Sequence, residues 1–274
     1  MNVPENAPKG KTGSVLDEIL AGTRARLPAL ARRAGDLERA AAVRPAPPSF
    51  RDALSVGPRL KLIAEVKRRS PSGGEISRGL DPVAHAKAYA AAGASAVSVL
   101  TEPAHFGGSI EDLTAVAAEI PLPVLRKDFI LDELQLVEAR AAGAAAVLLI
   151  VRALSRVELR TLLRGCGTLG LGALVEAHTA SEVDVALEAG ALVIGINSRD
   201  LDDLTIDHSA AWALLSRIPA DRVAVAESGI STADDAAIAA AAGADAVLVG
   251  GALSRAKSPT ALAASMTGVE RRGR

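Results

Sequence analysis

An acid and an amine stand two residues apart, at Glu65 and Lys67, in an otherwise apolar stretch that begins at Leu60. The flanking Gly57-Pro58 and Pro71-Ser72-Gly73-Gly74 are typical of the ends of a strand. Because alternate residues of a strand point to the same face, both charged side chains project from one face. Buried charges are costly unless they are paired or used. The pair therefore indicates either a structural ion pair or a functional site.

Polar residues or glycines also follow seven further apolar stretches. They are Thr101 and Glu102, Lys127 and Asp128, Arg152, Glu176 and His178, Asn197 and Arg199, Glu227 with Ser228 and Gly229, and Gly250 with Gly251. A solvated loop position would account for some of them, such as Glu102, Asp128 and Arg152, but not for the whole set. We therefore expect several of these side chains to converge on one site.

The elements that must position these residues repeat along the chain. Alanine-rich helical segments end in Ala-Gly-Ala or a close variant before an apolar strand, with glycines at Gly93, Gly143, Gly190 and Gly243. These glycines suit helix C-termini, where a left-handed backbone is needed. The spacing of about 50 residues holds two βα units of roughly 25–30 residues each. Eight strands alternating with helices predict a closed (β/α)8 barrel, the TIM-barrel fold of the α/β class, over residues 57–274.

Residues 1–56 are predicted to be a helical extension that caps the barrel mouth. Ser14 and Asp17 fit the start of a helix with a capping box. We expect Pro28 to begin a second helical segment that runs to about Val43.

The last two strand ends resemble a phosphate cradle. Ser228 and Gly229, and then Gly250 and Gly251, put small residues where backbone N–H groups can point at an anion. A short helix that begins near Ala252 would add its positive end. The alternative is that these glycines only form turns.

Two lysines, Lys67 and Lys127, could each clamp an anion, donate a proton or form a Schiff base. Glu65, Glu176 and Glu227 supply counter-charges. An amine surrounded by carboxylates stays protonated, which favours a general acid over a nucleophile.

Composition excludes other classes of function. The 274 residues carry a net charge of −1 and only 2% aromatic residues, so neither a basic surface nor a stacking surface for nucleic acid is expected. The single Cys166 and the scattered histidines give no metal-ligand spacing. The longest apolar run, residues 144–151, is too short to span a bilayer. We expect a cytoplasmic protein without metal or membrane partners.

Five motifs in order resemble indole-3-glycerol phosphate synthase of tryptophan biosynthesis, with likeness from about Val15 to Leu262. They are Ile-Ala-Glu-Val-Lys-Arg-Arg-Ser-Pro-Ser from Ile63, Arg-Lys-Asp-Phe-Ile from Arg126, Leu-Val-Glu-Ala-His from Leu174, Gly-Ile-Asn-Ser-Arg-Asp-Leu from Gly195, and Ala-Glu-Ser-Gly-Ile from Ala226. The resemblance implies ring closure of 1-(2-carboxyphenylamino)-1-deoxyribulose 5-phosphate with loss of carbon dioxide and water, without cofactor or metal. We also expect a monomer, with association with other enzymes of the pathway as a further possibility.

The resemblance assigns roles residue by residue. Lys127 falls at the position of the general acid, Glu176 at that of the general acid/base, and Lys67 near the substrate carboxylate and phosphate, with a part in dehydration. Glu65 and Asn197 match further catalytic positions. The implied substrate contacts are Ser70, Phe129, Leu131, Arg199, Glu227 and Ser228, and the implied phosphate contacts are Gly229, Gly250 and Gly251.

Three alternatives stay open from the residues. The chain could be another phosphate-binding barrel enzyme, either phosphoribosylanthranilate isomerase or a Schiff-base aldolase. For the isomerase, Cys166 is badly placed. It could also be an inactive barrel that serves as a scaffold, although intact Lys67, Lys127 and Glu176 argue against this.

Overall fold

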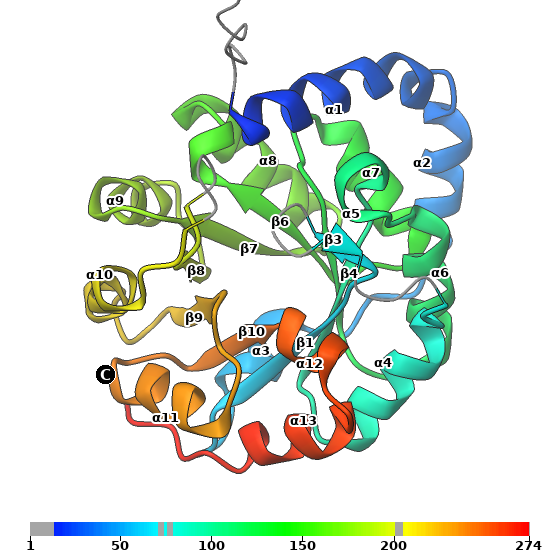
Figure 1. Ribbon diagram of the computed structural model, residues 1–274. Helices are drawn as coiled ribbons and strands as arrows, with labels where there is room; N and C mark the ends of the chain where they lie inside the picture. The colour runs from blue at the N-terminus through cyan, green and yellow to red at the C-terminus, as the bar shows by residue number, and fades with distance from the viewer. Residues whose placement is uncertain (1–13, 71–73, 76–78, 201–204, 274) are drawn as a thin grey trace, which may run out of the picture.

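A computed structural model describes residues 14–70, 74–75, 79–200 and 205–273. Eight parallel strands close into one barrel, in the order β1-β10-β9-β8-β7-β6-β5-β4 (Figure 1). Their bounds are β1 (Lys61–Val66), β4 (Ala96–Leu100), β5 (Val124–Lys127), β6 (Ala146–Ile150), β7 (Gly172–Ala177), β8 (Val193–Asn197), β9 (Val223–Glu227) and β10 (Ala246–Val249). The predicted (β/α)8 barrel is confirmed, with β1 paired to both β4 and β10.

Helices surround the barrel (Figure 1). The longer ones are α4 (Pro82–Ala91), α6 (Ile110–Glu119), α7 (Glu133–Ala142), α8 (Arg156–Thr168), α9 (Ala180–Glu188), α11 (Ala233–Ala241) and α13 (Pro259–Thr267), with α10 (His208–Ala213) followed by η2 (Leu214–Arg217). The four repeat glycines take the predicted left-handed backbone, with φ of 89° at Gly93, 92° at Gly143, 88° at Gly190 and 107° at Gly243. Each one ends a helix and allows the chain to turn into the next strand.

Short elements follow several of the barrel strands in the chain. They are β2 (Arg69–Ser70) and β3 (Gly74–Glu75), α5 (Pro103–Phe106), η1 (Val151–Ala153) and α12 (Gly251–Arg255). Of the described residues, none belongs to a helix that is both long and apolar enough to cross a membrane.

Three helices precede β1, and they reach both ends of the barrel. α1 (Val15–Ala31) begins with the predicted capping box between Ser14 and Asp17. α2 (Ala34–Ala42) packs on α7, whereas α3 (Phe50–Ser55) contacts β1, β4 and β9. Phe50 and Leu54 on α3 are buried in the apolar cluster inside the barrel.

The prediction that Pro28 begins a second helix is wrong. Pro28 lies inside α1, which continues to Ala31. Proline removes one backbone hydrogen bond from a helix. Pro28 is exposed, so the carbonyl left without a donor can bond to water. The flanking Gly165 and Gly167 would suggest a turn at Cys166, but Cys166 lies inside helix α8, where its buried side chain packs in the core.

Candidate active site

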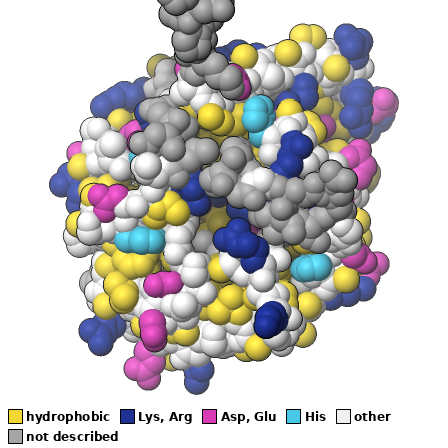
Figure 2. Space-filling model, in the orientation of Figure 1, with side chains coloured by type: hydrophobic (Ala, Val, Ile, Leu, Met, Phe, Trp, Pro, Cys, Tyr) yellow, Lys and Arg dark blue, Asp and Glu magenta, His cyan; other side chains and the backbone are white. Residues whose placement is uncertain are grey.

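A cavity of about 590 Å³ opens at the carboxyl ends of the barrel strands. In the space-filling view, basic side chains lie in and beside the hollow at the centre of this face (Figure 2). Most of the predicted site residues line it: Glu65, Lys67, Lys127, Phe129, Glu176, Asn197, Arg199, Glu227, Ser228, Gly229, Gly250 and Gly251. The strand ends therefore bring together residues that are more than 180 positions apart in the chain.

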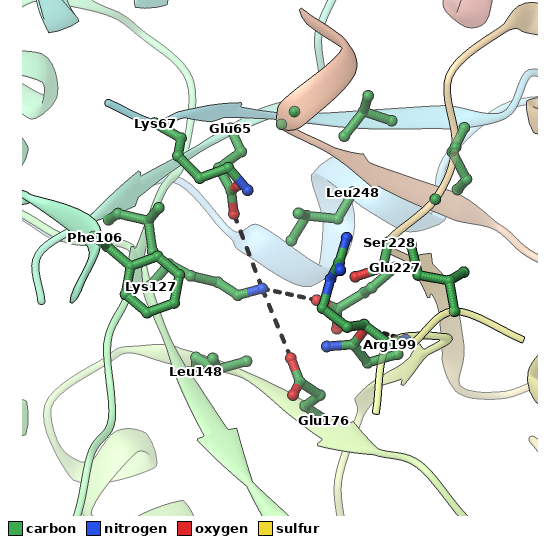
Figure 3. A pocket seen from close by; sticks show the side chains of 18 of the residues that line it. Glu65, Lys67, Phe106, Lys127, Leu148, Glu176, Arg199, Glu227, Ser228 and Leu248 are labelled. Atoms are coloured by element: carbon green, nitrogen blue, oxygen red, sulfur yellow. Dashed lines mark hydrogen bonds and ion pairs between the residues drawn. The ribbon is translucent and has the colours of Figure 1, made fainter. Parts of the chain in front are cut away.

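Lys127, the last residue of β5, is the centre of the charged cluster (Figure 3). Its Nζ lies 2.9 Å from Glu227 Oε2, 3.7 Å from Glu176 Oε2 and 4.0 Å from Glu65 Oε2. Burial opposes the charge of the amine, but Glu227, Glu176 and Glu65 outweigh it and raise the pKa of Lys127. Lys127 is therefore protonated at neutral pH, as a proton donor must be.

The carboxylates around Lys127 differ in their electrostatics. Burial raises the pKa of Glu227 to about 7, with further contributions from Glu176 and Glu65 that oppose the effect of Lys127. Burial also disfavours the charged form of Glu65, yet Lys67 and Lys127 outweigh it and lower the pKa of Glu65. Lys67 Nζ is 2.8 Å from Glu65 Oε1, so these two residues form an ion pair, and both also line the cavity. Two carboxyl groups whose pKa values are shifted in opposite directions can play different roles in proton transfer.

Two glycines allow the carboxylates to sit this close to the backbone. A Cβ at Gly250 would lie 2.1 Å from Glu65 Oε1, and a Cβ at Gly195 would lie 2.0 Å from Glu227 Oε1. Any side chain at either position would displace a carboxylate. Gly250 thus has a demonstrable role beside Glu65 in addition to its expected place near the phosphate.

The corner between β9 and α12 has the features of an anion site. Ser228 and Gly229 both have left-handed φ values, 65° and 72°, which turns the chain sharply after β9. Arg255 on α12 extends back toward Gly251, because a Cβ there would lie 3.0 Å from its guanidinium. Burial and the charge of Arg255 lower the pKa of Arg199. Two guanidinium groups therefore share this corner, where an anion would relieve their repulsion.

The opposite side of the cavity is apolar. Phe106 and Phe129 lie with ring centroids 6.3 Å apart, and Leu148 and Ile150 extend the surface along β6. Helix α1 contributes its first turns to the same wall through Val15, Leu16 and Ile19. A flat aromatic group fits this half of the cavity.

Two of the predicted substrate contacts, Leu131 and Ser70, are not among the described residues that line the cavity. Leu131 packs against the apolar cluster inside the barrel. Ser70 ends β2, and its side chain lies outside the described part of the structure.

The expectation that Glu102 and Asp128 are solvated is wrong. Glu102 is 1% exposed and caps α5 by accepting backbone N–H groups. Asp128 is 4% exposed and binds Arg126 and the Thr101 hydroxyl, with a distance of 2.7 Å to the hydroxyl. This buried network fixes the backbone directly after Lys127.

Comparison with known proteins identifies the family. A family model described as "Indole-3-glycerol phosphate synthase" matches residues 16–266. The chain belongs to the indole-3-glycerol phosphate synthase family. An indole-3-glycerol phosphate synthase of Nocardioides sp. is 48% identical over 263 residues, which cover 94% of this chain and 99% of that protein. Indole-3-glycerol phosphate synthase 2 of Streptomyces coelicolor is 53% identical over 202 residues, which cover 74% of this chain and 78% of that protein.

A solved structure of 3-hexulose-6-phosphate synthase is similar in fold. It superposes with a TM-score of 0.63 over 76% of this chain and 99% of that chain, at 18% sequence identity. At this identity the likeness shows the barrel fold alone.

Sequence reasoning missed several residues that line this cavity. Arg255, Phe106, His208 and the α1 side chains all line the cavity. Arg255 had a local signal, because it lies four residues after Gly251 and so on the same face of a helix. Phe106 and α1 had none, because they reach the cavity only through the tertiary fold. Among the described residues, no group of three His, Cys, Asp or Glu side chains is arranged to hold a metal ion.

Proposed function

We propose that this chain closes the indole ring of 1-(2-carboxyphenylamino)-1-deoxyribulose 5-phosphate, forming indole-3-glycerol phosphate with release of carbon dioxide and water. The observation that carries the proposal is the protonated Lys127 among three carboxylates, between an apolar wall and a cationic corner. The substrate has matching parts: an aromatic ring, a carbonyl group that must accept a proton, and a phosphate.

In the proposed binding mode, the phosphate lies in the corner of Ser228, Gly229 and Gly251, facing Arg199 and Arg255. Guanidinium groups suit phosphate oxygens because they donate in a planar fork. The aromatic ring lies against Phe106 and Phe129, with α1 as a lid of apolar side chains. The carbonyl carbon then falls between the two ends, near Lys127.

The first step forms the carbon–carbon bond. The aromatic carbon that bears the carboxylate attacks the carbonyl carbon, and Lys127 donates its proton to the carbonyl oxygen as it becomes a hydroxyl group. The neighbouring carboxylates hold Lys127 in the protonated form that this step needs. Carbon dioxide then leaves, and its bonding electrons restore the aromatic ring.

The second step removes the new hydroxyl group as water. An acid must protonate the leaving hydroxyl, and a base must accept the proton from carbon as the pyrrole double bond forms. We assign this exchange to Glu176 and to Lys67 with its partner Glu65, and we assign Asn197 to holding the hydroxyl groups. Glu227 keeps Lys127 in position through the contact of 2.9 Å.

We also infer that the enzyme acts in the cytoplasm as a monomer. A reducing compartment fits the free, buried thiol of Cys166. Light scattering of the purified protein tests the monomer, and a dimer mass would overturn it.

Turnover of the substrate, followed by the rise of indole fluorescence, tests the proposed function. The parent enzyme should turn over, and Lys127→Ala should lose roughly 10²- to 10⁴-fold in kcat. Lys87→Ala is the matched control, because Lys87 is an exposed lysine on α4, on the outside of the barrel, where it pairs with Glu119. A folded parent without turnover contradicts the proposal, and a lysine adduct trapped by borohydride would favour the aldolase.

A further inference from the structure

The two carboxylate oxygens of Glu176 face different partners. Oε2 lies 3.7 Å from Lys127 Nζ, on the side of the cavity. Oε1 lies 3.6 Å from Nε2 of His178, which follows β7 by one residue. Glu176 is 2% exposed, so these two contacts control how its carboxylate is turned.

His178 is itself held by Glu182 on α9. The backbone N–H of His178 donates to Glu182 Oε2 over 2.7 Å, and Nδ1 of the ring lies 3.5 Å from the same oxygen. Glu182 is fixed in turn, because its backbone N–H donates to the N-cap side chain of Thr179 over 3.2 Å. The imidazole side chain is 9% exposed, so the surrounding protein leaves it little freedom to turn toward solvent.

We propose that His178 is a positioning residue for Glu176, and that Glu182, His178 and Glu176 form a relay that aims one carboxylate oxygen into the cavity. The inference rests on the proposed function, in which Glu176 exchanges protons with the substrate. A proton acceptor works only when its oxygen lies at the correct distance and angle. The relay gives Glu176 that orientation from behind the cavity, without contact between His178 and the substrate.

The charges around His178 favour the imidazolium form. Glu176 from β7, Glu182 from α9 and Glu227 from β9 all face it, and Arg152 from η1 acts on Glu182. Burial opposes the charge, but the nearby carboxylates of Glu182, Glu176 and Glu227 outweigh it and raise the pKa of His178. The imidazolium has an N–H at both ring positions, so each ring nitrogen attracts the carboxylate that it faces, Glu182 at 3.5 Å and Glu176 at 3.6 Å.

Loss of that proton breaks the relay. A neutral imidazole that keeps its Nδ1 proton for Glu182 turns the lone pair of Nε2 toward Glu176 Oε1. Two acceptors then face each other, and the carboxylate is no longer held. The rate should therefore fall as His178 titrates, at a pH above the ordinary histidine value of about 6.5.

The test uses His178→Gln and Glu182→Gln in the full chain, with Glu188→Gln as the matched control. Glu188 carries the same side chain on the same helix, exposed and paired with Arg156. We expect His178→Gln to lower kcat roughly 10- to 100-fold with little change in KM, and to remove the inflection in the pH–rate profile that the titration of His178 produces. Glu182→Gln should move the inflection to lower pH, and Glu188→Gln should leave the pH profile unchanged.

A readout without turnover separates this inference from the proposed function. The imidazole resonances of His178, followed by NMR against pH, should titrate above about 6.5 in the parent and lower in Glu182→Gln. A parent that shows this titration but no turnover contradicts the proposed function alone. Turnover with a parental pH profile in folded His178→Gln overturns the relay, as does an unshifted titration in Glu182→Gln. If His178→Gln does not fold, Glu182→Gln decides the question by both readouts.

Discussion

Two layers of side chains fill the inside of the barrel, and they have opposite chemistry on the same strands. Four strands each contribute one residue to each layer. The lower residue, nearer the amino end of the strand, is apolar, and the upper residue, two positions later, is charged. These pairs are Ile63 and Glu65 on β1, Leu125 and Lys127 on β5, Leu174 and Glu176 on β7, and Val225 and Glu227 on β9. Both layers are largely removed from water. Of these eight residues, only the four of the upper layer line the cavity, and only they carry ionisable groups.

The difference shows how the barrel separates stability from chemistry. The lower layer packs against Phe50 and Leu54 of α3 and gains free energy from apolar burial. The upper layer crowds three carboxylates around one ammonium, so at least one carboxyl group is kept from ionising freely. Charged groups held in this way favour catalysis more than folding. Substitutions in the two layers should therefore affect different measurements.

The largest effect is expected in the upper layer, from Glu176→Gln. The amide keeps the shape of the side chain but cannot exchange a proton, so kcat should fall roughly 10²- to 10⁴-fold. The melting temperature should stay within a few degrees of the parent, because the volume is unchanged. Indole fluorescence and a thermal melt measure the two quantities. A large drop in melting temperature would show that the charged layer also contributes strongly to the stability of the fold.

The reciprocal change is Leu174→Ala, two residues earlier on the same strand. Leu174 is fully buried, so the truncation leaves a cavity and should lower the free energy of unfolding by about 2–5 kcal/mol. At a temperature where the variant is folded, kcat/KM should change little. Urea unfolding and initial rates provide the test. Activity lost as severely as in Glu176→Gln would erase the distinction between the layers.

A smaller effect should appear in the dependence of stability on pH, through Glu227. Its pKa in the fold, about 7, is above its ordinary 4.5, so the folded protein holds the proton more tightly than the unfolded chain. This contribution is complete below pH 4.5 and is lost as the pH rises through 7. Its size is roughly 3 kcal/mol, at about 1.4 kcal/mol per pH unit.

Glu227→Gln removes this dependence. The stability of the parent relative to the variant should decline between pH 5 and pH 8, as measured by denaturant unfolding at each pH. If the stabilities of the parent and the variant change with pH in parallel, the raised pKa of Glu227 is contradicted. Glu188→Gln is the control, because Glu188 is an exposed carboxylate on the outside of the barrel.

The smallest effect is expected at the edge of the upper layer, from Arg255→Ala. Arg255 is exposed at the proposed phosphate corner, so water screens part of its attraction for an anion. We expect KM to rise about 5-fold, or roughly 1 kcal/mol, with kcat nearly unchanged. Arg217→Ala, an exposed arginine that pairs with Asp184, should leave KM at the parental value. An equal effect of both variants would remove Arg255 from the site.

Much of this arrangement could be predicted from local sequence. The repeated Gly93, Gly143, Gly190 and Gly243 give the period of the barrel, because a left-handed helix end is a property of a few neighbouring residues. Glu65 and Lys67 indicate a functional site, because two charged residues in an apolar strand have few structural explanations. The predictions fail where a local signal fits two structures. Pro28 has the features of a helix start, yet its exposed position lets α1 continue.

The sequence by itself determined the strands, the order of the polar residues at their ends and the face on which each side chain projects, since these follow from periods of two and 3.6 residues. Only the tertiary structure decided that Lys127 meets carboxylates from three other strands, and that Gly250 and Gly195 leave room for two of them. It also decided that α1 reaches the cavity and that His178 lies between Glu176 and Glu182. Such contacts depend on barrel closure, which sets distances between residues far apart in the chain.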